Sequence, residues 1–375
     1  MRFADVIGHD AAKDLLRRLA DEQRLPHALM LVGGEGSGHL PLALALARYV
    51  LCEAPREGEP CEQCVQCRHS AHYTHPDLHF SFPTVGSKAT SEQYYKQWRE
   101  ALEENPYLNV HQWLMRLDAE NRQGNITRDE CVQIVRKLSL KTFEGRHKVL
   151  LMWMPEYLGK EGNRLLKLIE EPPPNTLFLF VAENPDLILG TILSRCQMVR
   201  LSPLTDEQIA AALQQREGLD AEQALAFAQI ADGNYNKALE LARTTDQPHA
   251  RVFVDWLRKC YARQGADLVQ WCNEAAKWGR EPQKNFLHYG LHFWRELLVW
   301  NLSGHAMPLR LLPSEQETAR KMARVVGPEQ IEPIAKLFDE AIFHIERNAN
   351  PKILFMDLSI RLGKLMRQRS ITPSA

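Results

Sequence analysis

The sequence predicts a doubly wound α/β domain over residues 1–203, followed by an all-helical remainder. Short apolar runs alternate with helical patterns in the first part, and two glycines of a nucleotide-binding loop follow the first run. After Pro203, every periodic segment has helical spacing. The 375 residues, 45% hydrophobic and 25% charged, are ordinary for a globular chain with a substantial core.

Five runs rich in β-forming residues are the predicted strands. Continuous apolar runs of this length are typical of strands that are buried on both faces of a parallel sheet. A polar segment over about 83–124 interrupts the alternation, and we interpret it as a surface insertion between a strand and the next helix. The predicted strands are 28–32, 78–82, 149–153, 177–181 and 198–201.

The glycine cluster after the first run is an incomplete phosphate-binding loop. Gly33 and Gly38 have the spacing of G-x-x-x-x-G-K-[ST], but His39 and Leu40 replace the lysine and the hydroxyl residue. Leucine cannot bind Mg²⁺, and an unperturbed histidine is mostly neutral at pH 7. The loop's backbone N–H groups could still form an anion-binding nest.

The acidic half of such a site is also missing. The segment "HKVLLMWMPE" has Trp153 and Met154 at the end of the predicted strand, where an Asp-Glu pair would bind Mg²⁺, and Glu156 comes two residues too late. Two independent losses predict that the chain keeps a nucleotide-binding fold but has no nucleotide cofactor. We therefore expect that it does not hydrolyse ATP.

Four cysteines with the spacing C-x8-C-x2-C-x2-C predict a structural metal site. Four thiolates fill the tetrahedral shell of Zn²⁺ and leave no open position for catalysis. The predicted ligands are Cys52, Cys61, Cys64 and Cys67. The alternatives are four unligated thiols, or zinc with one thiol replaced by His69, His72 or His75.

The triplet Ser194-Arg195-Cys196 stands at the entrance to the last predicted strand. An arginine on a loop at a sheet edge can supply positive charge to the γ-phosphate of a neighbouring subunit's ATP. The alternative for Arg195 is a solvated side chain or a local ion pair.

The helical remainder begins with a capping box, in which Thr205 and Gln208 have the required spacing. Three short helices in about 40 residues suggest a small lid-like domain. Longer helices follow, and "NFLHYGLHFWRELLVW" has one broad apolar face. This face fits the core of a helical bundle, a surface that packs on another chain, or both.

A net charge of −1 argues against a global basic field for nucleic acid. The sequence has neither an apolar run of about 20 residues nor an N-terminal signal-peptide pattern, so we expect a cytoplasmic protein without membrane contact and with reduced cysteines.

The stretch "LLKLIEEPPPNTLFLFVAENPDLILGTILSRCQMVRLSPLT" resembles the AAA+ clamp-loader subunits of bacterial DNA polymerase III. The four-cysteine module, "HPDLH" and "TFEGRHKV" are also similar to segments of that family. The resemblance covers most of residues 1–245, and the C-terminal part matches only in class.

The resemblance implies three domains: a degenerate RecA-like AAA+ domain (1–203) with a zinc module (52–67), a helical lid (204–245), and a helical collar for oligomerisation (246–375). It also implies a non-ATPase subunit of the polymerase assembly, because the family's ATPases keep the loop lysine and the acidic pair. The implied partners are the ATPase (gamma/tau) and clamp-opening (delta) subunits, and, through the complex, the sliding clamp and primer–template DNA. Arg195, with Ser194 and Cys196 as its motif, would then act in trans in clamp loading. The alternative is a zinc-bearing, AAA+-derived adaptor outside replication.

Overall fold

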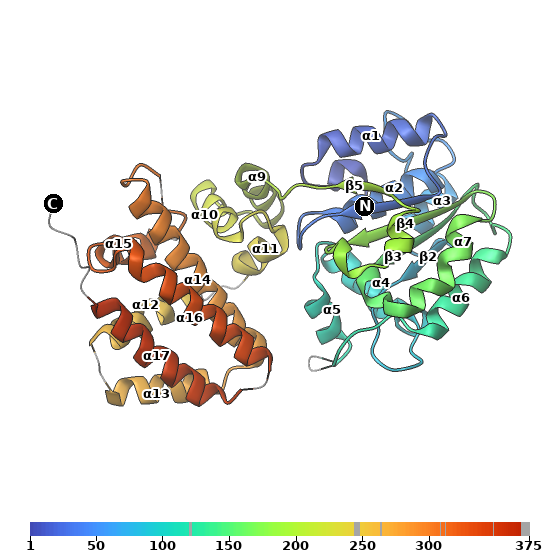
Figure 1. Ribbon diagram of the computed structural model, residues 1–375. Helices are drawn as coiled ribbons and strands as arrows, with labels where there is room; N and C mark the ends of the chain where they lie inside the picture. Colours follow the sequence, from blue (N-terminus) through green and yellow to red (C-terminus); the bar gives the residue numbers. More distant parts are fainter. Residues whose placement is uncertain are drawn as a thin grey trace. The chain divides into compact units, whose positions relative to one another are not determined.

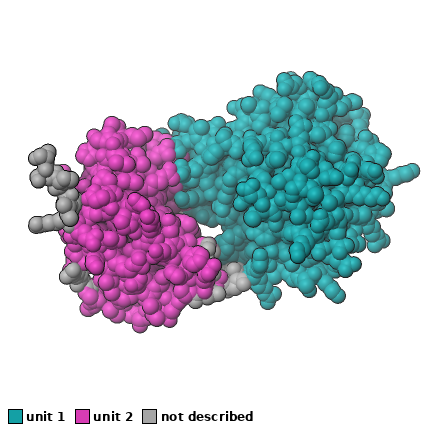
Figure 2. Space-filling view, viewed as in Figure 1, with its two compact units in different colours: residues 1–221, 231–240 teal, residues 222–230, 241–375 magenta. Residues whose placement is uncertain are grey.

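The computed structural model describes residues 1–119, 122–243, 248–262, 265–307, 309–311, 313–347 and 349–368. The chain divides into two compact units, which Figure 2 shows in different colours. Unit 1 comprises residues 1–221 and 231–240, and unit 2 comprises residues 222–230 and 241–375. The three-domain division at 203 and 245 stays a prediction.

Unit 1 is built on a five-stranded sheet whose pairs are all parallel, in the order β2-β3-β4-β1-β5 (Figure 1). The five predicted strands are confirmed within one residue at each end. The strands are β1 (Ala28–Val32), β2 (Leu78–Ser81), β3 (Lys148–Trp153), β4 (Thr176–Ala182) and β5 (Gln197–Arg200).

Helices cover both faces of this sheet. Unit 1 contains α1 (Asp10–Asp21), α2 (His39–Leu51), α3 (Val65–Ala71), α4 (Tyr95–Glu104), α5 (Val110–Arg116), α6 (Arg128–Ser139), α7 (Leu166–Glu170), α8 (Gly190–Leu193) and, after the last strand, α9 (Asp206–Glu217). Short 3₁₀ segments lie at Phe3–Asp5, Ser91–Tyr94, Pro155–Leu165 and Pro185–Leu187.

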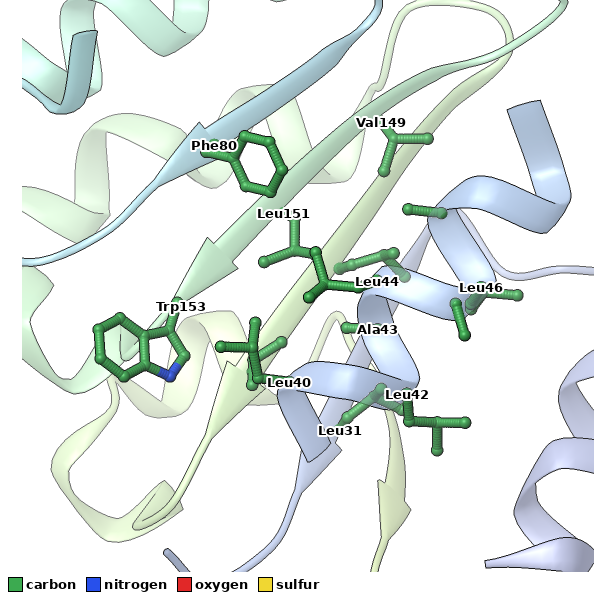
Figure 3. Packing of buried hydrophobic residues seen from close by; sticks show 14 of the residues in the cluster. Leu31, Leu40, Leu42, Ala43, Leu44, Leu46, Phe80, Val149, Leu151 and Trp153 are labelled. Atoms are coloured by element: carbon green, nitrogen blue, oxygen red, sulfur yellow. The ribbon is translucent and has the colours of Figure 1, made fainter. Parts of the chain in front are cut away.

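Alternate residues of β1, β3 and β4 enter two separate apolar clusters, as the period of a strand requires. Leu29 and Leu31 face α2, whereas Met30 packs on the side of α6 and α7. Figure 3 shows the first cluster, in which Leu40, Leu44 and other α2 side chains pack against the sheet. The predicted doubly wound arrangement is therefore confirmed.

The insertion is not confined to the surface, and the prediction was wrong in that respect. Trp98 on α4 and Trp113 on α5 are fully buried and pack edge to face, with ring centroids 5.0 Å apart. Phe82 stacks on Trp98 at 4.4 Å. The polar composition of the segment concealed two aromatic anchors that extend the core past the edge strand β2.

Unit 2 is helical. Its helices are α12 (Pro248–Ala262), α13 (Gly265–Ala275), α14 (Arg280–Leu302), α15 (Pro313–Ala323), α16 (Pro328–Glu346) and α17 (Pro351–Arg367). Residues 222–230 of α10 (Ala221–Ala231) belong to it as well, while α11 (Tyr235–Arg243) is divided between the units.

The apolar face predicted in "NFLHYGLHFWRELLVW" lies in the core of unit 2. Phe286, Phe293 and Trp294 of α14 are fully buried. Gly290 lets α16 approach closely, because a Cβ atom there would meet the ring of Phe338 at 2.3 Å. The interpretation as a core helix is confirmed, and packing on another chain stays a prediction.

Within the part of the chain that the structure describes, none of the helices combines the length and the apolar character that a membrane crossing requires.

Candidate functional site

The degenerate phosphate loop joins β1 to α2 at the carboxyl edge of the sheet, the usual place for a nucleotide in such folds. Gly38 precedes α2 with φ +102°, a backbone conformation that glycine adopts readily. Residues 36–40 are all buried. The loop is thus covered by its own chain.

His39 does not replace the missing lysine charge. Its side chain is 4% exposed and its Nδ1 lies 3.2 Å from Ser37 Oγ. Burial, followed by the nearby His9, lowers the pKa of His39 to about 4. The imidazole is therefore neutral at pH 7, as the sequence analysis expected.

Leu40 and Trp153 occupy the two positions where Mg²⁺ chemistry would need a hydroxyl and a carboxylate. Both are buried, at 2% and 1% exposure, in the apolar cluster between α2 and the sheet (Figure 3). An apolar pair in this place extends the core and offers no oxygen ligand.

Glu156 is used to join two strand ends. Its Oε1 accepts hydrogen bonds from the backbone N–H groups of Glu183, at 2.6 Å, and Asn184, at 2.8 Å, just after β4. Burial, followed by the carboxylates of Glu35 and Glu156, raises the pKa of Glu183 to about 8. A phosphate at this edge would meet carboxyl groups where an active site places cations.

The four predicted metal ligands converge. The sulfur atoms of Cys52, Cys61, Cys64 and Cys67 all lie within 4.8 Å of one another, with 3.9 Å between the second and fourth. Sulfurs around a tetrahedral Zn²⁺, with Zn–S bonds of about 2.3 Å, stand about 3.8 Å apart. The donor set and its spacing therefore fit a structural zinc.

Backbone N–H groups turned toward the sulfurs also suit thiolates. Cys64 N donates to Cys61 Sγ at 3.4 Å, and Cys67 N donates to Cys64 Sγ at 3.3 Å. The Cys64 N–H is the main reason that the pKa of Cys61 falls to about 6. The alternative histidine ligands face elsewhere: His69 Nδ1 lies 3.6 Å from Glu144, and His75 Nδ1 accepts from Asp77 N.

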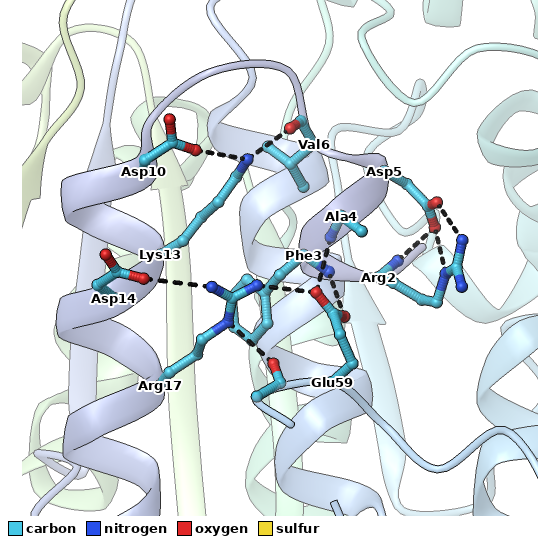
Figure 4. Close-up of polar contacts among 11 residues, drawn as sticks. Arg2, Phe3, Ala4, Asp5, Val6, Asp10, Lys13, Asp14, Arg17 and Glu59 are labelled. Carbon is cyan, nitrogen blue, oxygen red and sulfur yellow. Dashed lines mark hydrogen bonds and ion pairs between the residues drawn. The ribbon is translucent and has the colours of Figure 1, made fainter. Parts of the chain in front are cut away.

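The cysteine module is fastened to the N-terminal segment and to α1 (Figure 4). The carboxylate of Glu59 accepts from the backbone N–H groups of Phe3, at 3.1 Å, and Ala4, at 2.9 Å. Arg17 binds the same carboxylate at 2.8 Å and donates to Gly58 O at 2.9 Å. These bonds hold the module to the body of unit 1.

The segments "HPDLH" and "TFEGRHKV" meet through one carboxylate. Buried Asp77 accepts from the backbone N–H groups of Phe143, Glu144 and Gly145 at 2.7, 2.9 and 2.7 Å. Gln66 on α3 donates to Glu144 O at 3.4 Å, so the same loop is also tied to the cysteine module.

Arg195 lies between α8 and the edge strand β5, as predicted. Its Nη2 and Nε donate to Glu170 Oε2 at 2.9 and 3.2 Å, and its Nη1 donates to Thr191 O at 2.9 Å. The side chain is 32% exposed. In this chain by itself, Arg195 forms a local ion pair, which is the alternative to an arginine finger.

Comparison with known proteins finds a matching family and several relatives. The profile of the family described as "DNA polymerase III, delta subunit" matches residues 8–205. The DNA polymerase III subunit delta' of Bacillus subtilis is 27% identical over 244 residues, which cover 64% of this chain and 61% of that protein. The Escherichia coli delta' subunit is 26% identical, covering 57% and 54% respectively.

The tau subunit of Bacillus subtilis is also a relative, 21% identical over 94% of this chain and 60% of its own length. The chain thus spans about three fifths or less of these curated relatives. Because both delta' and tau subunits match, sequence similarity does not by itself decide between the kinds of subunit in the family.

Proposed function

This chain belongs to the DNA polymerase III clamp-loader family, and from that membership we propose that it is a delta-prime-like subunit that does not hydrolyse ATP. In this role it helps a ring of subunits to load the sliding clamp onto primer–template DNA. Its partners are the ATPase (gamma/tau) and clamp-opening (delta) subunits.

The phosphate loop is the single observation that carries the non-ATPase role. A neutral His39 and a buried Leu40 stand where the lysine and the hydroxyl would bind phosphate and Mg²⁺. Trp153 places an apolar ring at the position where such a site has its acidic residue. The degeneration is therefore built into the core, and the chain's contribution to ATP hydrolysis has to come from another surface.

Arg195 is the group that we propose for this contribution, acting on ATP bound by the neighbouring subunit. Its exposed ion pair with Glu170 does not prevent that role, because such pairs are worth only about 0–1 kcal/mol. A hydrogen-bonded contact with a phosphate is stronger. Thr191 O and Ser194 Oγ, which also accept from Nη1, orient the guanidinium at the edge of the sheet.

We propose that the cysteine module holds one structural Zn²⁺. The bound ion would cross-link the segment between α2 and α3, which has little apolar core of its own. No catalytic step depends on it.

The first test compares wild type with Arg195→Ala in the assembled complex. The chain is mixed with the cognate ATPase and clamp-opening subunits, assembly is checked by gel filtration, and ATPase stimulated by DNA and clamp is measured. We expect intact assembly and a large rate loss at the site next to this chain, since an arginine finger contributes roughly 10³-fold or more.

Arg164→Ala is the matched control, because Arg164 forms a comparable exposed ion pair with Glu161. An unchanged rate for Arg195→Ala in an intact complex would refute the trans role and leave a scaffold. Failure of the wild-type chain to join any complex would favour the adaptor outside replication.

A further inference from the structure

The insertion between β2 and α6 lies against the degenerate phosphate loop, and nothing in the proposed function requires this. We propose that the insertion takes the structural place of a bound nucleotide. Its side chains hold residues 231–240 against the phosphate loop in the absence of any ligand. The inference goes beyond the proposed function and does not depend on it, because all of its contacts are within unit 1.

The first link is made by the loop that follows α4. The Asn105 side chain donates from Nδ2 to Asn236 Oδ1 at 2.6 Å, and its Oδ1 accepts from Tyr107 N at 3.0 Å. Asn236 is 1% exposed. The Asn105 amide bonds to a residue 131 positions away, and breaking this bond would leave the buried Asn236 Oδ1 without that donor, so the bond fixes both segments.

The second link passes through Glu35 of the phosphate loop. Its Oε1 accepts from Asn109 Nδ2, in the insertion, at 3.0 Å and from Asn234 Nδ2 at 3.1 Å. One carboxylate of the loop therefore joins the insertion to the segment before α11. Gln112 on α5 adds a parallel bond of 2.6 Å to Glu240.

The third link is aromatic. The ring of Tyr107 packs edge to face on Tyr235, with centroids 4.8 Å apart, and its hydroxyl accepts from Ile7 N at 2.9 Å. The same ring closes over the loop, since a Cβ atom on Gly38 would meet it at 3.2 Å.

The fastened segment contacts the loop backbone itself. Tyr235 N donates to Gly36 O at 3.1 Å, and a Cβ atom on Gly36 would overlap Asn234 Oδ1 at 1.9 Å. In a nucleotide-binding protein, a ligand bound between loop and neighbouring segment would stabilise their closed arrangement by its binding energy. Here side chains of the same chain supply that stabilisation, and a phosphate would have to displace them.

The test measures hydrogen exchange in the full chain for wild type, Glu35→Ala and the double variant Glu35→Ala/Asn105→Ala. Both variants remove hydrogen-bonding groups of side chains that are not fully buried, and both leave the apolar clusters intact. We expect exchange of the amides of residues 234–240 to rise by about tenfold in the double variant, because several hydrogen bonds are lost. Amides of β3 and β4 serve as the internal check on folding.

Glu100→Ala is the matched control, since Glu100 is an exposed carboxylate on α4 in the same insertion. Unchanged exchange of 234–240 in the double variant, with β3 and β4 protected, would overturn the proposal. If the double variant fails to fold, Glu35→Ala alone decides the outcome by the same readout.

A fluorescent N-methylanthraniloyl-ATP titration with Mg²⁺ tests the other consequence. We expect no saturable binding to wild type and no change in its exchange at 33–40. Saturable binding that raises exchange in 105–112 would show that nucleotide displaces the insertion, and would overturn its role as a permanent replacement.

Discussion

At single positions, the residues that stand where a nucleotide site has catalytic groups make structural contacts instead. Leu40 and Trp153 pack in the main apolar cluster, and Glu156 joins the ends of β3 and β4. Restoring a lysine or an aspartate at such positions would bury charge in a site that now lacks partners for it. One substitution at these positions would therefore not build a Mg²⁺ site.

Asp77 provides a prediction at the same scale. Burial by itself raises its pKa, but the backbone N–H groups of Gly145, Phe143 and Glu144 outweigh burial, so the pKa of Asp77 is lowered. A lowered pKa means that the carboxylate stabilises the fold at neutral pH and loses this effect as pH falls through the folded-state value. Asp77→Asn should therefore lower the free energy of unfolding by about 1–3 kcal/mol at pH 7.

Urea unfolding of both proteins at pH 7, 5 and 3 checks this prediction. The difference between wild type and Asp77→Asn should be the same at pH 7 and 5 and become smaller below about pH 4. Asp186→Asn, at an exposed position, should have little effect. A difference that does not change with pH would show that the ionised form is not what the loop requires.

At the scale of elements, unit 1 carries two additions on its sheet: the cysteine module and the insertion. The module has few apolar residues, and Glu59 and Arg17 hold it to the N-terminal segment. The insertion has two buried tryptophans and holds residues 231–240 to the phosphate loop. One addition relies on four converging cysteines and polar bonds, and the other relies on an extended core.

The proposed zinc site predicts a specific loss of metal. Protein prepared with zinc in the medium should contain about one zinc per chain, and Cys64→Ser should contain almost none, because four thiolates complete the shell. Elemental analysis of the purified chains measures this directly. Cys131→Ala, which alters a buried cysteine of α6, should keep its zinc. Equal loss from both variants, or a wild type without zinc, would contradict the metal site.

At the scale of the molecule, the chain has two compact units with separate apolar clusters. In unit 1 one apolar cluster lies on each face of a parallel sheet, and the cluster of unit 2 is formed mainly by helices. Since the clusters share no residues, a cavity in one should not weaken the other directly.

Leu151→Ala and Leu297→Ala test this independence. Each removes a fully buried leucine, one from each cluster, and should cost its own unit about 2–5 kcal/mol. Hydrogen exchange should become faster in β3 and β4 for the first variant and in α14 and α16 for the second. Equal acceleration in both units after either substitution would show that they unfold as one.

The sequence by itself determined the strands of the sheet and the residue types at the positions of the nucleotide motifs. Five apolar runs without polar alternation predicted strands buried on both faces, because period and composition are local properties. The cysteine spacing predicted four converging sulfurs, since short intervals restrict where ligands can lie. The missing lysine, hydroxyl and acidic pair were equally visible in the linear order.

The tertiary structure alone decided what lies over the loop. Asn105 and Asn236 carry no motif, and their hydrogen bond depends on two segments that only the fold brings together. The aromatic anchors of the insertion, Trp98 and Trp113, were hidden by a polar composition. Contacts between distant residues depend on the packing of the whole unit, and no local pattern of residues specifies them.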